Sequence, residues 1–138
     1  MLPGDNRKIL TWTLVAVLIC PPVADFVAWS SWRQGLQRVA DNAAMDAAAA
    51  IQYGKAPESL AFAGRRVDRL RLVAPPVIEH PPRAGRYAGR AGAVRITLVA
   101  VRAPFFWSKL FGPVRMTAVS TAALVPSQPS GTRPARVE

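Results

Sequence analysis

The sequence has one cysteine, one histidine and only 8 acidic residues. The lone Cys20 lies inside an apolar run, so the chain has no disulfide framework. His80 has no second histidine to join it and no cysteine outside the apolar run, which makes a zinc-type site a poor fit. The sequence also lacks a glycine-rich phosphate loop and the GxSxG pattern of a nucleophile elbow. We therefore expect no enzymatic activity, no cofactor and no metal.

The scarcity of acidic residues leaves a formal net charge of +10. Beyond residue 32 there are sixteen basic and six acidic residues, so the excess lies outside the apolar run. Such a surface is either simply solvated or attracts an anionic partner. The candidates are anionic lipid headgroups, a cell-wall polymer and nucleic acid.

An apolar run near the N-terminus is long enough to cross a bilayer. Residues 9–24 are uncharged, and taken as far as Trp32 the run gives about 36 Å of helix. We expect a single transmembrane helix over residues 9–32, preceded by a short N-terminal segment, 1–8. A cleaved signal peptide is the main alternative, but Pro22 stands where a small side chain is required before the cut.

Two prolines and one carboxylate interrupt this run. Pro21 and Pro22 remove two backbone donors and predict a kink. Asp25 follows one turn later, and a carboxylate inside a bilayer costs a few kcal/mol unless it reaches water or a partner. We single out Asp25 as an assembly residue that answers a positive group on a neighbouring subunit. The alternative is that the apolar core ends at Ala24 and that Asp25 marks the interface.

An alanine-rich helix is expected over residues 33–54. Residues 36–50 read LQRVADNAAMDAAAA, alanine is the best helix former, and Gly54 supplies a stop. Small side chains recur at three- and four-residue steps, so one face suits close packing against a sheet or against a neighbouring helix. The packing residues we expect on this face are Leu36, Ala40, Ala43, Ala44 and Ala47, and Ala48 extends the small-residue pattern.

Residues 55–125 are expected to form a small α+β domain. A short helical turn follows Pro57, and three segments then alternate apolar and polar residues: 67–73, 93–102 and 114–125. This pattern predicts a small antiparallel sheet of about three strands, covered by the alanine face. After Pro126 the sequence predicts a disordered tail over residues 126–138.

A long basic loop is expected between the first two predicted strands. Residues 75–92 contain four prolines and three glycines, which disfavour regular pairing. Arg83, Arg86 and Arg90 lie around Tyr87 in a candidate anion-binding loop, although a lone tyrosine is a poor stacking platform. The simpler interpretation is a solvated loop.

Residues 104–112 read PFFWSKLFG and predict one or two helical turns closed by Gly112. So many large apolar side chains must be covered by something. The protein core is the favoured cover, with a partner or the membrane surface as alternatives.

Two stretches share one further pattern. Asp25 ends an apolar segment, an aromatic-rich turn follows, and Leu36 begins LQRVADNAAM eleven residues later. Residues 94–98, 104–112 and 119–123 then give a strand, an FFxxLFG-like turn and a closing strand rich in alanine, threonine and valine. This combination resembles the TadE/TadG-like proteins of the tight-adherence (Flp) pilus assembly system. The family's opening RxGxxAxxF is absent here.

The resemblance implies a minor pilin-like or accessory membrane protein that acts by subunit packing. It implies a bacterial inner-membrane location, a single pass and a periplasmic C-terminal domain. The partners expected are other subunits of a pilus or secretion assembly and membrane lipid, with a homo-oligomer left open. The alternative from the charge excess is a membrane-tethered basic module that binds an anionic polymer, nucleic acid being the less favoured ligand.

Overall fold

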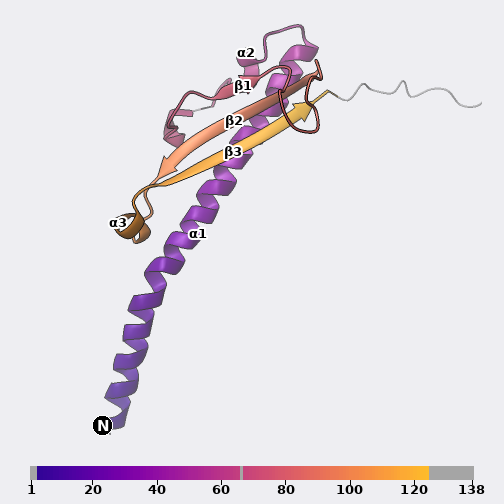
Figure 1. Ribbon diagram of the computed structural model, residues 1–138. Helices are drawn as coiled ribbons and strands as arrows, with labels where there is room; N and C mark the ends of the chain where they lie inside the picture. The colour runs from indigo at the N-terminus through magenta and orange to yellow at the C-terminus, as the bar shows by residue number, and fades with distance from the viewer. Residues whose placement is uncertain (1–2, 66, 125–138) are drawn as a thin grey trace, which may run out of the picture.

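The structure is a computed structural model that describes residues 3–65 and 67–124 (Figure 1). It contains one long helix, α1 (Pro3–Gln52), and a three-stranded antiparallel sheet. The expected tail over residues 126–138 lies outside the described residues. The fold is α+β, with the N-terminal half of α1 projecting away from the sheet (Figure 1).

Helix α1 is unbroken over 50 residues, although Pro21 and Pro22 lie inside it. The two prolines cannot donate, so the carbonyls of Val17 and Leu18 lose their usual partners one turn later. The helix continues through this point. Instead of the kink that the two prolines predict, Figure 1 shows at most a gentle bend. At its other end α1 stops before Gly54, whose φ of 68° suits a residue without a Cβ atom.

The sheet has the order β1-β2-β3. Its two long strands, β2 (Ala93–Arg102) and β3 (Val114–Ala123), pair antiparallel along their full length, from Ala93 opposite Ala123 to Arg102 opposite Val114. Both were predicted from the period-two pattern. Alternate residues of β2 are buried, with Val94, Ile96 and Leu98 fully covered.

The first predicted strand is wrong. Residues 67–70 form a 3₁₀ turn, η1 (Val67–Leu70), and Arg71 has a φ of 50°, which is incompatible with an extended strand. The edge strand is instead β1 (Val77–Glu79), which pairs with β2 through Val77 opposite Thr97. It lies within the stretch expected to be a loop, because flanking prolines are tolerated beside a short edge strand.

The alanine face of α1 packs on the sheet, as expected. Leu36, Ala40, Ala43, Ala44 and Ala47 lie in one core with the inward residues of β2 and β3. The short helix α2 (Glu58–Ala61) adds Ala61 to the same core, and Figure 1 shows it near the C-terminal end of α1. Since the small residues contact the sheet and α2 of their own chain, this face is not free for a neighbouring helix.

A salt bridge fastens the segment after α2 to α1. The Arg65 guanidinium pairs with the Asp46 carboxylate and also donates to the carbonyl of Ala61 at 2.8 Å. Asp46 therefore forms an ion pair within the chain while its side chain stays 45% exposed.

Candidate functional site

The N-terminal part of α1 is an exposed apolar stalk, which we define as residues 5–20. Every one of these residues is exposed. Leu10, Trp12 and Leu18 each keep more than seven-tenths of their surface open. Helix α1 is long and apolar enough to cross a membrane, near the N-terminus of the chain. The domain itself covers none of this surface.

Asp25 is the first residue beyond the stalk that the domain buries, at 6% exposure. Its Oδ1 accepts a hydrogen bond from the backbone N–H of Phe105 at 3.0 Å. Its Oδ2 accepts bonds from the backbone N–H groups of Phe106 and Trp107, the latter at 2.9 Å. The carboxylate therefore holds three donors at the start of helix α3 (Trp107–Phe111), eighty residues away in sequence.

Helix α3 needs this partner because its own sequence supplies no cap. The N-cap residue is Phe106, which makes no side-chain hydrogen bond, so the first N–H groups of the helix lack a local acceptor. A negative carboxylate at a helix N-terminus also interacts favourably with the helix dipole. In many helices the side chain of the N-cap residue accepts these hydrogen bonds. In α3 the acceptor is instead Asp25, which belongs to α1.

The expectation that residues 104–112 fill the core is wrong for α3. None of its described residues, Trp107–Phe111, is buried. Phe105 and Phe111 are 76% and 77% exposed, and Leu110 is 63% exposed. The physical reason is that a five-residue helix at the end of a hairpin has too little contact area to cover its large side chains.

These side chains continue the apolar surface of the stalk. Phe26 and Val27 on α1 are exposed at the level of Asp25. A cavity of about 300 Å³ separates this part of α1 from α3, lined by Asp25, Phe26, Trp29, Pro104, Trp107, Phe111 and Val114. We call the exposed apolar residues of α1, of α3 and of the turn before α3 at this level the collar: Phe26, Val27, Phe105, Leu110 and Phe111.

Basic side chains lie next to the collar. Lys109 Nζ is 4.9 Å from the centre of the Phe105 ring. On the side of the domain, the guanidinium of Arg33 lies 5.7 Å from the Trp29 ring centre and that of Arg102 lies 5.4 Å from the Trp32 ring centre. Cation–π pairs of this kind keep the charged groups beside the aromatic surface and accessible to an anion.

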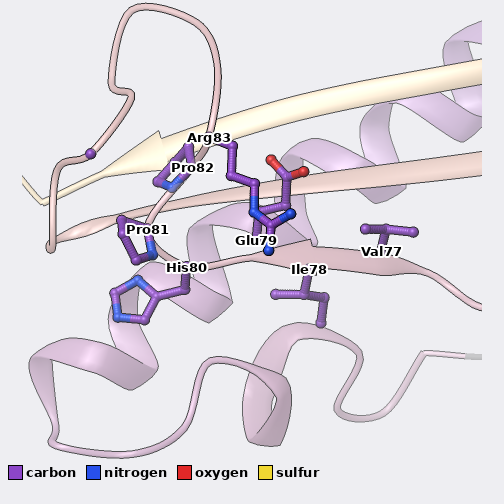
Figure 2. Close-up of a pocket in the computed structure, with 8 residues that line it drawn as sticks. Val77, Ile78, Glu79, His80, Pro81, Pro82 and Arg83 are labelled. Atoms are coloured by element: carbon purple, nitrogen blue, oxygen red, sulfur yellow. The ribbon is translucent and has the colours of Figure 1, made fainter.

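The predicted anion-binding loop is divided in the structure. Arg86 and Arg90 are exposed, and their guanidinium groups lie 5.8 and 5.9 Å from the centre of the Tyr87 ring. Arg83 instead lines a cavity of about 710 Å³ together with Glu79 and His80 (Figure 2). The three arginines therefore form no single cluster, and the cavity holds a carboxylate as well as a cation.

Glu79 was not among the site residues predicted from the sequence. Its Oε2 atom is buried and accepts no hydrogen bond from the described residues. The imidazole Nδ1 of His80 lies 3.0 Å from the carbonyl oxygen of Ala93, so this ring is held by the loop end of β2. Among the described residues no group of three or more His, Cys, Asp or Glu side chains is placed to hold a metal ion.

The contact between Asp25 and α3 was also missed at the sequence level. Asp25 was selected for its position in an apolar run, with a positive group of another subunit as the expected partner. Its two oxygens already accept three bonds within the chain, so its charge needs no such partner. The available signal was the absence of a capping residue before Trp107.

Comparisons with known proteins give no relative for this chain. A scan of family models finds none that matches, and searches of curated proteins and of solved structures find no match.

Proposed function

We propose that the chain is a single-pass inner-membrane protein that acts as a minor pilin-like or accessory subunit of a Flp-type pilus or a related secretion assembly. Residues 9–32 would lie in the membrane and the sheet domain in the periplasm. The resemblance of residues 25–45 and 94–123 to TadE/TadG-like proteins motivates the assignment. The chain would act by packing against other subunits, and not by catalysis.

The observation that carries the proposal is the exposed stalk. Residues 9–20 of the stalk are twelve consecutive uncharged and exposed residues, and a surface of this kind favours lipid or other apolar helices around it. A subunit held in a membrane-embedded assembly provides such surroundings. The alanine face, in contrast, is already used by the sheet, so contacts between subunits would be made by the stalk.

Cell fractionation combined with protease accessibility tests this proposal. We expect the protein in the inner-membrane fraction after a carbonate wash, with residues beyond Arg33 cleaved by protease only after the outer membrane is opened. Affinity purification from mildly solubilised membranes should recover pilus or secretion platform proteins. A soluble protein, or a domain protected on the cytoplasmic side, would refute the proposal.

A second candidate function is a membrane-tethered basic module. Arg86 and Arg90, which are exposed and stacked near one tyrosine, are the specific observation in its favour. Binding to an anionic cell-wall polymer should weaken steeply with salt and in the variant Arg86→Gln/Arg90→Gln. Absence of any salt-dependent binding would remove this candidate while leaving the first untouched.

A further inference from the structure

The uncharged part of α1 is too short to cross a bilayer alone. Residues 9–24 span about 24 Å of helix, whereas the hydrocarbon core of a bilayer is about 30 Å thick. Arg7 and Lys8 close the N-terminal side. The apolar run continues after Asp25 as Phe26, Val27 and Ala28. We therefore place the missing length, about four residues, on the C-terminal side, with the hydrocarbon boundary at about Ala28.

At that depth Asp25 would be costly without partners. The three backbone N–H groups of Phe105, Phe106 and Trp107 donate to both carboxylate oxygens, and Asp25 is only 6% exposed. Because these bonds tie α3 to α1, α3 must lie at the same depth as Asp25. The exposed apolar side chains at this depth are Phe105, in the turn before α3, and Leu110 and Phe111 of α3, all largely exposed.

We propose that α3 is a second membrane contact: Phe105, Leu110 and Phe111 insert at the boundary between hydrocarbon and headgroups of an anionic bilayer, and Asp25 fastens this insertion to α1. This inference rests on the membrane location proposed above. It explains why a segment with four large apolar side chains is not buried in the domain. It also makes the collar continuous with the stalk as one lipid-facing surface.

Charge complementarity favours lipid over a second copy of the chain. Lys109 lies over the Phe105 ring of the collar, and Arg33 and Arg102 lie over Trp29 and Trp32 on the domain side of the collar. Two copies meeting through their collars would bring these cations together. Anionic headgroups would instead neutralise them, and tryptophan with arginine is a typical composition at the membrane interface.

Spin-label accessibility in vesicles tests the inference on the full chain. The background is Cys20→Ala, and a label is attached at Phe111→Cys, Leu110→Cys, Leu14→Cys or Thr117→Cys. The first two positions report the collar, Leu14 the stalk, and Thr117 an exposed residue of β3. The protein is reconstituted in vesicles of phosphatidylglycerol and phosphatidylcholine, and collisions with oxygen and with a water-soluble nickel chelate are measured.

We expect the ratio of oxygen to nickel collisions at 110 and 111 to be several-fold higher than at 117, and highest at 14. Water-like ratios at 110 and 111 with a high ratio at 14 would overturn the inference but keep the membrane location. A water-like ratio at 14 would overturn both. Spin–spin broadening at 111 that disappears on dilution with unlabelled protein would assign the collar to a second copy and overturn lipid insertion.

A companion variant tests whether Asp25 fixes the position of α3 in the membrane. Asp25→Ala in the 111-labelled chain removes the fastening and leaves the apolar side chains in place. We expect higher label mobility and a broader range of depths, with the ratio at 14 unchanged. An identical spectrum and depth at 111 would show that Asp25 does not fasten α3.

Discussion

At the scale of single residues, Asp25 links two segments that are far apart in the sequence. One carboxylate satisfies three N–H groups at the start of α3, and no other side chain of α3 or of the residues before it caps them. Hydrogen bonds to a charged group contribute about 1.5–3 kcal/mol, and donors left unpaired in a buried place cost a similar amount. The position of α3 therefore depends on a residue that lies eighty positions earlier.

Removal of this carboxylate should release α3. We expect Asp25→Ala to weaken the docking of α3 by about 2–3 kcal/mol and Asp25→Asn, which keeps one acceptor oxygen, by less. Hydrogen exchange at the amides of residues 105–107 is the measurement. The matched control is Asp41→Ala, since Asp41 bonds Gln37 within α1 at 2.8 Å and does not contact α3. Unchanged exchange in Asp25→Ala would contradict the capping role.

The salt bridge between Asp46 and Arg65 should matter little by comparison. The two side chains are 45% and 26% exposed, so water screens the pair, and the expected loss in Asp46→Asn is below about 1 kcal/mol. Arg65→Ala should cost more because it also removes the bond to the Ala61 carbonyl. Thermal unfolding of the two variants in detergent at low and high salt measures this, and equal losses would argue against the backbone bond.

At the scale of elements, the contact between α1 and the sheet is built from methyl groups. Ala40, Ala43, Ala44 and Ala47 are completely buried, so the helix backbone approaches the sheet closely. Interiors of this density have no room for additional atoms. The stability of the domain therefore depends on keeping these side chains small.

A larger side chain in this face should separate helix and sheet. Ala44→Leu is expected to destabilise the domain by about 1–3 kcal/mol through overpacking. The control is Met45→Leu, one residue further along α1, where the side chain is 58% exposed and the change should be near neutral. Thermal unfolding of the two detergent-solubilised variants gives the comparison, and similar midpoints would contradict the packing argument.

The sequence predicted the elements whose pattern is long and uniform. Residues 93–102 and 114–123 alternate apolar and polar side chains over ten residues each, which predicts strands of that length. The alanine-rich helix has a helical repeat of small residues and ends before a glycine, so its repeat and its end point to the same element. The strand predicted over residues 67–73 was wrong because the alternation of Leu70 and Leu72 with arginines has another cause. Both leucines pack against the core, but Leu70 belongs to the 3₁₀ turn η1 and Leu72 makes only an isolated bridge to Ala100. Alternating burial over so few residues does not require a strand.

The candidate site was predicted in part. Asp25 and the aromatic turn at 104–112 were each selected from the sequence, but their contact depends on how the β2–β3 hairpin lies against α1. That arrangement is set by the core, and no local pattern encodes it. The buried oxygen of Glu79 was missed for the same reason, since its environment forms only when β1 pairs with β2.

At the scale of the whole molecule, α1 divides the chain into a part that packs and a part that does not. Residues 36–51 lie in or beside the core, whereas residues 5–20 touch none of the described domain. Changes in the stalk should therefore affect membrane association without affecting the fold of the domain. This separation gives a prediction for stalk substitutions.

Two charges in the stalk should detach the protein from the membrane. Leu14→Arg and Leu18→Arg each add about 2.5–3.5 kcal/mol to the cost of insertion near the bilayer centre. We expect the double variant in the carbonate-soluble fraction, with the thermal unfolding midpoint of the domain unchanged. The double variant with valine at both positions should remain in the membrane fraction. Carbonate resistance of the arginine variant would contradict the assignment of the stalk.

The continuity of α1 also fixes the rotational phase between the stalk and the sheet. Since the helix passes through Pro21 and Pro22 without interruption and Asp25 holds the hairpin, the two parts turn together. Each alanine inserted after Leu18 would rotate the sheet by about 100° relative to the stalk. A neighbouring subunit that binds one side of the stalk would therefore also determine the direction in which the sheet faces. Two inserted residues should disrupt assembly, whereas four, close to one full turn, should largely restore it.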